Sequence, residues 1–320
     1  MTHSFNILAL AGLLTALTTT IGSAQGGLPL SDLAYAPEGI SHDASGNLYV
    51  GSLTQGRIVK FAAGSRQLTE FAPAGANGMV TILGVHVQGD QVFACSSDPG
   101  FGVLAGTAAP ALVAFDVKTG KAAGRYPLPE GGILCNDIAA LPDGTLLATD
   151  SFAPRIYALK PGADHLDVWF EDDQFGGEGF NLNGIAYDDG AVYVARYNSG
   201  TLHKIPVGAE GQAGPAKEID LGRQVVGADG LTALGQGRFL LVEGGGLQKD
   251  ARGALLGVTV TGNAGVLVNI APELNVPTTA TVIGDTAYVV EGQLDHLFDP
   301  NAGPADPYRI LEIKLPEAFQ

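Results

Sequence analysis

The chain has 320 residues, of which 33 are acidic and 17 are basic, so its formal net charge is −16. A field of this sign repels phosphate backbones and anionic lipid surfaces, which argues against nucleic-acid and membrane partners, and it attracts cations. The 46 Gly and 18 Pro indicate many tight turns and little helix, and the length suits one large all-β domain or two smaller ones.

The N-terminal segment 1–24 predicts a signal peptide. Its apolar stretch, Ile7–Leu17, is too short to span a bilayer, and the small residues before Gln25 allow cleavage after Ala24. The segment has no Lys or Arg ahead of this stretch, so a frayed or buried N-terminal helix is the alternative. We expect an exported protein, periplasmic or extracellular, whose mature domain comprises residues 25–320.

The mature chain contains two cysteines, Cys95 and Cys135. In an oxidising compartment two cysteines can form a disulfide, but two separate buried thiols fit the sequence equally well. Both possibilities stay open at this point.

Six segments share one pattern: a polar or small residue, a short apolar strand, a turn rich in Gly or Asp, and a second strand. Successive segments begin 45, 53, 47, 46 and 49 residues apart. A period of about fifty residues with such turns is typical of the four-stranded blade of a β-propeller. The first residues of the segments are Glu38, Leu83, Asn136, Asn183, Asp229 and Thr278.

The fold class that we predict is therefore all-β, a six-bladed β-propeller with four-stranded blades. We expect the C-terminal strand "RILEIKL" to pair with residues around 27–36, because this pairing closes the ring and leaves no open sheet edge. A solenoid or a pair of packed sheets is the competing all-β arrangement.

The first residues of the six segments should form a ring at the top of the central channel. The first strand of each propeller blade lines the channel, so equivalent positions come together around the axis. The longest irregular segments, 96–111, 171–180, 244–253 and 292–308, are expected on the same face. Long loops gathered on one face usually cover a functional site.

The ring predicts a metal site. Glu38, Asn136, Asn183 and Asp229 offer four side-chain oxygens, and hard cations such as Ca²⁺ bind about six to eight oxygens. Two carboxylates nearly balance a doubly charged ion, whereas a Cys or His set at zinc spacing is missing from the sequence. The alternative is that these polar residues hold only ordered water.

Four motifs in register resemble the senescence-marker-protein, regucalcin and gluconolactonase family. They are "PEGI" at 37–40, "CND" at 135–137, "NGIAYD" at 183–188 and "ADGL" at 228–231, and the similarity in order and spacing covers residues 35–315. The resemblance implies a six-bladed propeller with one catalytic divalent cation, often Ca²⁺, that hydrolyses lactones or related esters. Mn²⁺, Mg²⁺ or Zn²⁺ are the alternative ions.

The resemblance also assigns residues. Glu38, Asn183 and Asp229 match the family's metal ligands, and Asn136 matches a fourth asparagine that faces either the metal or the substrate. The sequence departs from sugar lactonases in two places, because Leu134 stands where they carry an Arg, and Ile138 stands where a Gly is usual. Both positions lie where a sugar lactone would be held, so an aldonolactone substrate is not predicted.

A second set of polar residues is expected near the upper ends of the second strands. We predict that Arg196, Glu243 and Glu291 contact the substrate, with a salt bridge from Arg196 to Asp150 or Glu243 as the alternative. His296, in the last long loop, is a candidate for substrate binding and proton transfer, with a plain surface position as the alternative. Asp229 is the leading general base, and Asp150 is the second candidate.

These observations favour an exported, metal-dependent hydrolase of a small-molecule lactone or ester. Two alternatives remain: a non-catalytic propeller that binds a ligand or a protein, and a lyase or a strictosidine-synthase-like enzyme on the same scaffold. Serine-hydrolase chemistry is disfavoured, because the sequence has no Gly-x-Ser-x-Gly.

Overall fold

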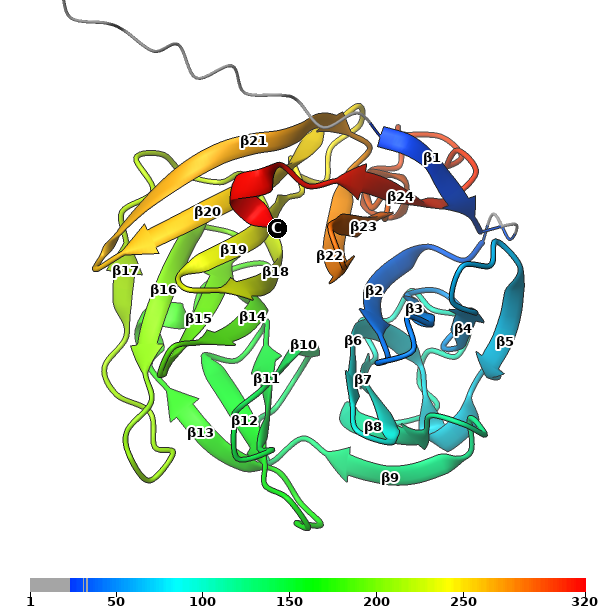
Figure 1. Ribbon diagram of the computed structural model, residues 1–320. Helices are drawn as coiled ribbons and strands as arrows, with labels where there is room; N and C mark the ends of the chain where they lie inside the picture. The colour runs from blue at the N-terminus through cyan, green and yellow to red at the C-terminus, as the bar shows by residue number, and fades with distance from the viewer. Residues whose placement is uncertain (1–23, 31, 33) are drawn as a thin grey trace, which may run out of the picture.

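Each sequence repeat folds into one antiparallel sheet of four strands in the computed structural model, and the six sheets surround a common axis (Figure 1). The structure describes residues 24–30, 32 and 34–320. The predicted six-bladed β-propeller is confirmed. The predicted signal peptide, 1–24, lies outside the described residues except for Ala24, with which the first strand begins.

The first three blades follow the chain order of their strands. Blade 1 contains β2 (Pro37–His42), β3 (Leu48–Ser52), β4 (Ile58–Phe61) and β5 (Leu68–Ala72). Blade 2 contains β6 (Thr81–Gln88), β7 (Gln91–Ser97), β8 (Ala111–Asp116) and β9 (Ala122–Pro127). Blade 3 contains β10 (Cys135–Ala140), β11 (Leu146–Asp150), β12 (Arg155–Leu159) and β13 (Asp167–Glu171).

The remaining blades complete the ring. Blade 4 contains β14 (Leu182–Asp188), β15 (Ala191–Arg196), β16 (Thr201–Pro206) and β17 (Lys217–Ile219). Blade 5 contains β18 (Ala228–Gly235), β19 (Arg238–Glu243), β20 (Gly253–Thr261) and β21 (Ala264–Leu274). Blade 6 contains β22 (Pro277–Ile283), β23 (Thr286–Glu291), β24 (Arg309–Lys314) and β1 (Ala24–Pro29).

Helices are few and short. They are α1 (Asp295–Phe298) and the 3₁₀ turns η1 (Ala76–Gly78), η2 (Asp173–Phe175) and η3 (Glu317–Phe319). Within residues 24–30, 32 and 34–320, no helix is long and apolar enough to span a membrane.

The ring is closed by pairing between the two ends of the chain. β1 pairs with β24 in antiparallel register, for example Gly27 with Leu311, and the two strands lie side by side in Figure 1. The strand that pairs with β24 is Ala24–Pro29, so it begins and ends a few residues before the expected region, 27–36. The chain must leave the outer edge of blade 6 after Pro29 to reach the channel at β2, and on this path Tyr35 is buried and donates to the Val50 carbonyl at 2.7 Å.

The hydrophobic core lies between neighbouring blades. The rings of Tyr193 and Phe239, from blades 4 and 5, have centroids 4.5 Å apart. The second strands β3 and β11 are buried at every residue, because each of their two faces packs against a neighbouring blade. The propeller is thus held together by apolar surfaces that the alternating strands present to both sides.

A repeated irregularity shapes the channel wall. In all six inner strands the pairing with the second strand shifts at the residue that begins the sequence repeat and at the residue after it. Such bulges redirect a side chain away from the regular face of a sheet. Gly39, Gly84, Gly184 and Gly230 follow four of these residues, and a Cβ on any of them would lie 2.1–2.5 Å from an atom of the next blade. The glycines therefore allow the inner strands to approach closely around the axis.

Candidate metal centre and pocket

Four polar side chains from four blades converge near the axis: Glu38, Asn136, Asn183 and Asp229. Each is at least 94% buried, with exposed fractions of 6%, 2%, 5% and 4%. All four line a pocket under the long loops, and all four also line a smaller cavity bordered by residues further along the inner strands. They therefore form the floor between the two spaces, as the sequence repeat predicts.

The other two ring positions do not contribute a free oxygen. Leu83 supplies an apolar side chain to the pocket wall. The Thr278 hydroxyl is buried and donates to the Glu38 carbonyl at 2.9 Å, which fixes the backbone beside a candidate ligand. The four oxygen donors are thus set by blades 1, 3, 4 and 5.

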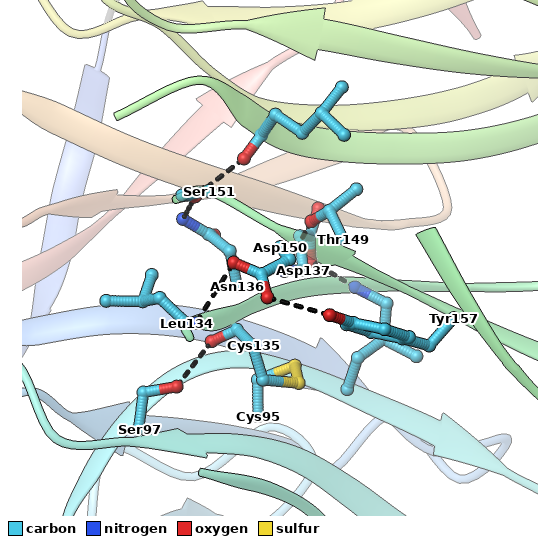
Figure 2. The surroundings of a disulfide bond; sticks show 12 residues. Cys95, Ser97, Leu134, Cys135, Asn136, Asp137, Thr149, Asp150, Ser151 and Tyr157 are labelled. Carbon is cyan, nitrogen blue, oxygen red and sulfur yellow. Dashed lines mark hydrogen bonds between the residues drawn. A yellow bond between two sulfur atoms is a disulfide. The ribbon is translucent and has the colours of Figure 1, made fainter. Parts of the chain in front are cut away.

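The amide of Asn136 has one defined orientation (Figure 2). Its Nδ2 donates to the Ser151 hydroxyl at 2.7 Å, and that hydroxyl donates to the Leu182 carbonyl at 2.6 Å. Asn136 Oδ1 is buried and has no hydrogen-bond partner among the described residues. A buried amide oxygen without a donor is costly, so this atom is arranged to bind something that a protein group does not supply.

A disulfide supports the same position. Cys95 of β7 and Cys135 of β10 are joined, with Cα atoms 5.1 Å apart, and the bond links blades 2 and 3 next to Asn136 (Figure 2). The Ser97 hydroxyl donates to the Cys135 carbonyl at 3.0 Å across the same interface. The sequence left this pairing open, and the structure shows it.

The carboxyl groups of the floor repel one another. Burial raises the pKa of Glu38 well above its usual value, and the nearby Asp229 and Asp137 raise it further. Burial and Asp137 likewise raise the pKa of Asp229, which the neighbouring Asn183 amide partly opposes. Partial burial also raises the pKa of the nearby half-buried Asp137, to about 6. Several buried acids near one another create a site whose charge a cation would neutralise.

The donor set fits a hard cation. Two carboxylates and two amides, one with an unpartnered oxygen, are oxygen ligands of the kind that Ca²⁺ or Mg²⁺ prefers. In the part of the chain that the structure describes, no three or more His, Cys, Asp or Glu side chains are grouped to hold a metal. Any ion here must accordingly rely on the asparagine oxygens, which disfavours a softer metal with N or S ligands.

Five residues predicted for catalysis or substrate contact do not line the pocket. They are Asp150, Arg196, Glu243, Glu291 and His296, and the lining consists of other residues. The His296 ring bonds the Gly303 carbonyl at 2.9 Å, within its own loop. The alternative salt bridge from Arg196 to Asp150 or Glu243 does not form either, because Arg196 donates to the Gly176 carbonyl at 2.6 Å and to Asn181 at 3.2 Å.

The residues at the ends of the second strands share a structural task. In every blade this side chain bonds the link that enters the same blade from its predecessor. Asp150 accepts from the amides of Ile133 and Leu134 at 2.7 and 3.0 Å. The links are bonded by Ser52, Ser96, Asp150, Arg196, Glu243 and Glu291.

Arginine partners complete two of these positions. Glu243 makes a bidentate bond to Arg223 at 2.7 and 2.8 Å, and Glu291 accepts from Arg309 at 2.6 Å. Both carboxylates are thus committed to holding loops. The sequence repeat predicts that these residues lie at the end of the propeller that carries the pocket, but it does not predict their hydrogen-bond partners. For this reason the sequence by itself assigns them to the pocket.

Tyr197 is a polar residue of the site that the sequence does not reveal. It directly follows β15, lines the pocket, and its hydroxyl is buried with no hydrogen-bond partner within residues 34–320. Burial and the nearby Asp229 carboxylate raise its pKa, so the hydroxyl keeps its proton and can donate. Its position depends on a bond from its own amide to the Asn181 carbonyl at 2.8 Å, which no motif indicates.

Fold and floor together define a six-bladed propeller with a pocket at one end of its channel, whose floor carries four oxygen-bearing side chains. No protein-family model matches the chain, and no curated protein matches it significantly. Solved structures with the same fold include a gluconolactonase from Xanthomonas campestris, with TM-score 0.61 and 16% identity over 90% of this chain and 88% of that one.

Two further similar structures carry different names. One is a luciferin-regenerating enzyme, with TM-score 0.64 and 13% identity over 89% of this chain and 92% of that one. The other is virginiamycin B lyase from Staphylococcus aureus, a variant solved with quinupristin, with TM-score 0.58 and 14% identity over 92% and 100%. The resemblance read from the motifs is thus confirmed in the fold, and the fold alone does not select one reaction.

Proposed function

We propose that the protein is a divalent-metal-dependent hydrolase of lactones or related esters, with Ca²⁺ as the expected ion. The observation that carries the proposal is the floor of the pocket, where the unpartnered Asn136 Oδ1 lies among Glu38, Asn183 and Asp229. A propeller that only displayed a binding surface would have no need to bury two repelling carboxylates at this point.

The residues of the floor would hold the ion. Glu38 and Asp229 supply charge, while Asn136 and Asn183 supply neutral oxygens that leave the ion electrophilic. When bound, a divalent cation supplies Lewis acidity, which polarises an ester carbonyl and makes water more acidic.

The side chains then have separate roles in hydrolysis. Water adds to the carbonyl carbon, the bond to the ring oxygen breaks, and the product is one chain with a carboxylic acid and an alcohol; the acid then releases its proton to solvent and leaves as a carboxylate. Asp229 accepts the proton from water, and the proton passes to the departing alkoxide. The Tyr197 hydroxyl, beside Asp229 in the pocket, donates a hydrogen bond to a substrate oxygen.

Asp229 is a better base than Asp150. Both oxygens of Asp150 are occupied, because three amides donate to Oδ1 and the Ile133 amide and Tyr157 hydroxyl donate to Oδ2, all at 2.7–3.0 Å. A carboxylate held by five donors has no oxygen left for water. Asp150 also lies outside the pocket lining.

The test compares Asp229→Asn with Asp164→Asn, which removes the same charge from a side chain that is 97% exposed. Chelated and Ca²⁺-loaded proteins are assayed on a panel of lactones, and bound metal is measured by mass spectrometry. We expect Asp229→Asn to lose bound metal and roughly 10²-fold or more in kcat/KM. The matched control should resemble the wild type.

Other outcomes select the alternatives. Full activity in Asp229→Asn would remove the hydrolytic mechanism. Ligand binding without turnover would favour a non-catalytic propeller. Metal-dependent cleavage that forms an alkene product without consuming water would identify a lyase.

A further inference from the structure

The walls of the pocket are apolar. Of the fourteen described residues that line it, five are Leu, three are Phe and one is Pro, and the polar side chains are those of the four floor residues and Tyr197. The pocket is only partly enclosed and opens to solvent. Leu134 lies in this wall.

Aromatic rings from three separate loops meet at the pocket, and we call Phe101, Phe180 and Phe298 the aromatic cover. The centroids of Phe101 and Phe298 are 5.5 Å apart, and those of Phe180 and Phe298 are 5.9 Å apart, both edge to face. Phe180 also contacts the ring of Tyr197, 6.0 Å away. Phe298, in α1, remains 37% exposed, so the cover presents apolar surface to solvent as well as to the pocket.

The polar side chains that could bind sugar hydroxyls are turned elsewhere. Arg196, Glu243 and Glu291 hold the links between blades, as described above. A polyhydroxylated lactone in this pocket would bury hydroxyl groups against Leu and Phe, without partners for their hydrogen bonds. An alkyl or aryl substituent would instead gain from burial against the same walls.

We propose that the substrate is an apolar lactone or ester, with its carbonyl at the polar floor and an alkyl or aryl substituent under the aromatic cover. The turnover test of this inference rests on the proposed hydrolase function. The binding part depends only on the walls, and the two can be examined separately.

The experiment compares two six-membered lactones of similar ring chemistry, δ-decalactone and glucono-δ-lactone, on the full chain with Ca²⁺. We expect kcat/KM to be at least about 100-fold higher for δ-decalactone, since each additional buried methylene gives roughly a fourfold gain. Binding without turnover is measured by calorimetry with the corresponding lactams, 6-pentylpiperidin-2-one and gluconolactam.

Two variants test the walls. Phe298→Ala, at a half-exposed position where folding should not suffer, is expected to weaken the alkyl lactam about tenfold and leave gluconolactam unchanged. Val103→Ala is the matched control, because Val103 belongs to the same group of top loops, is 74% exposed and does not line the pocket. Leu134→Arg should lower kcat/KM for δ-decalactone at least tenfold.

The outcomes separate this inference from the proposed function. Equal or better turnover of glucono-δ-lactone would overturn the apolar substrate and leave a hydrolase. Tight, Phe298-dependent binding of the alkyl lactam with no hydrolysis of either lactone would keep the apolar ligand and overturn the hydrolase. If the alkyl lactam does not bind, or binds equally to Phe298→Ala, the inference is wrong.

Discussion

The amide of Asn136 shows how one hydrogen bond decides the role of a residue. Because Ser151 takes the Nδ2 of the amide at 2.7 Å, the buried Oδ1 is left for a ligand. Asp150, which pairs across β10 and β11 with Cys135, the residue before Asn136, is fully engaged by protein donors and serves structure. At the scale of single residues, free atoms rather than residue types identify the site.

The Tyr197 hydroxyl gives the first prediction at this scale. Since it has no partner among the described residues, Tyr197→Phe should leave the melting temperature unchanged or slightly higher. The loss of a donor to substrate should lower kcat/KM roughly tenfold or more. Both are measured on the purified protein by thermal unfolding and a lactone assay.

A matched tyrosine makes this test specific. The Tyr157 hydroxyl donates to Asp150 Oδ2 at 3.0 Å and does not line the pocket, so Tyr157→Phe should lower stability by about 1 kcal/mol. Its effect on turnover should be small. The reverse pattern, with Tyr197→Phe destabilised and fully active, would show that the Tyr197 hydroxyl is structural.

At the scale of elements, the propeller repeats a joint six times. The inner strand has a bulge near its first residue, and in most blades a glycine follows the first bulged residue. The last residue of the second strand bonds the segment that enters the blade from its predecessor. The sequence predicts the position of this joint in each blade, because the repeat places equivalent residues at equivalent heights. It cannot predict which groups the side chain bonds, because the partners are backbone atoms of links that differ in length and course.

The disulfide between blades 2 and 3 is the second prediction. It closes a loop across 40 residues, so removing it with Cys95→Ala and Cys135→Ala should lower the free energy of unfolding by about 2–4 kcal/mol. Urea unfolding of the metal-free protein measures this loss. Asn136 directly follows Cys135, so Ca²⁺ affinity, measured by calorimetry, should fall as well.

The matching control separates the bond from the packing of the two sulfurs. Wild-type protein treated with reductant keeps both side chains and loses only the cross-link, and it should reproduce most of the destabilisation. Unchanged unfolding in both samples would show that the interface is held by β7 and β10 without the bond. Unchanged Ca²⁺ affinity in the double variant would show that Ser97 and Ser151 suffice to position the amide.

For the whole molecule, the sequence predicts architecture better than specificity. The spacing of the repeats predicts six blades and brings Glu38, Asn136, Asn183 and Asp229 together, since both follow from the symmetry of a propeller. Apart from Leu83, the walls of the pocket come from segments between the strands that obey no repeat. The sequence therefore does not predict that residues such as Phe298 line the pocket. The register of β1 against β24 is likewise not part of the repeat, so the sequence predicts it only approximately.

The last prediction concerns metal binding and the stability of the entire propeller. An ion that binds only the folded state adds about 2.7 kcal/mol at a concentration 100-fold above its dissociation constant, which should raise the melting temperature by roughly 5 °C. A protein with net charge −16 also attracts cations everywhere, so the comparison needs NaCl at matched ionic strength. Asp229→Asn should lose the Ca²⁺-dependent increase, whereas Asp164→Asn, with the same change in charge, should keep it. Because the change relieves repulsion with Glu38 and Asp137, the metal-free Asp229→Asn protein should be at least as stable as the metal-free wild type. An equal effect of Ca²⁺ on both variants would show that the ion acts on the surface field and not on the floor of the pocket.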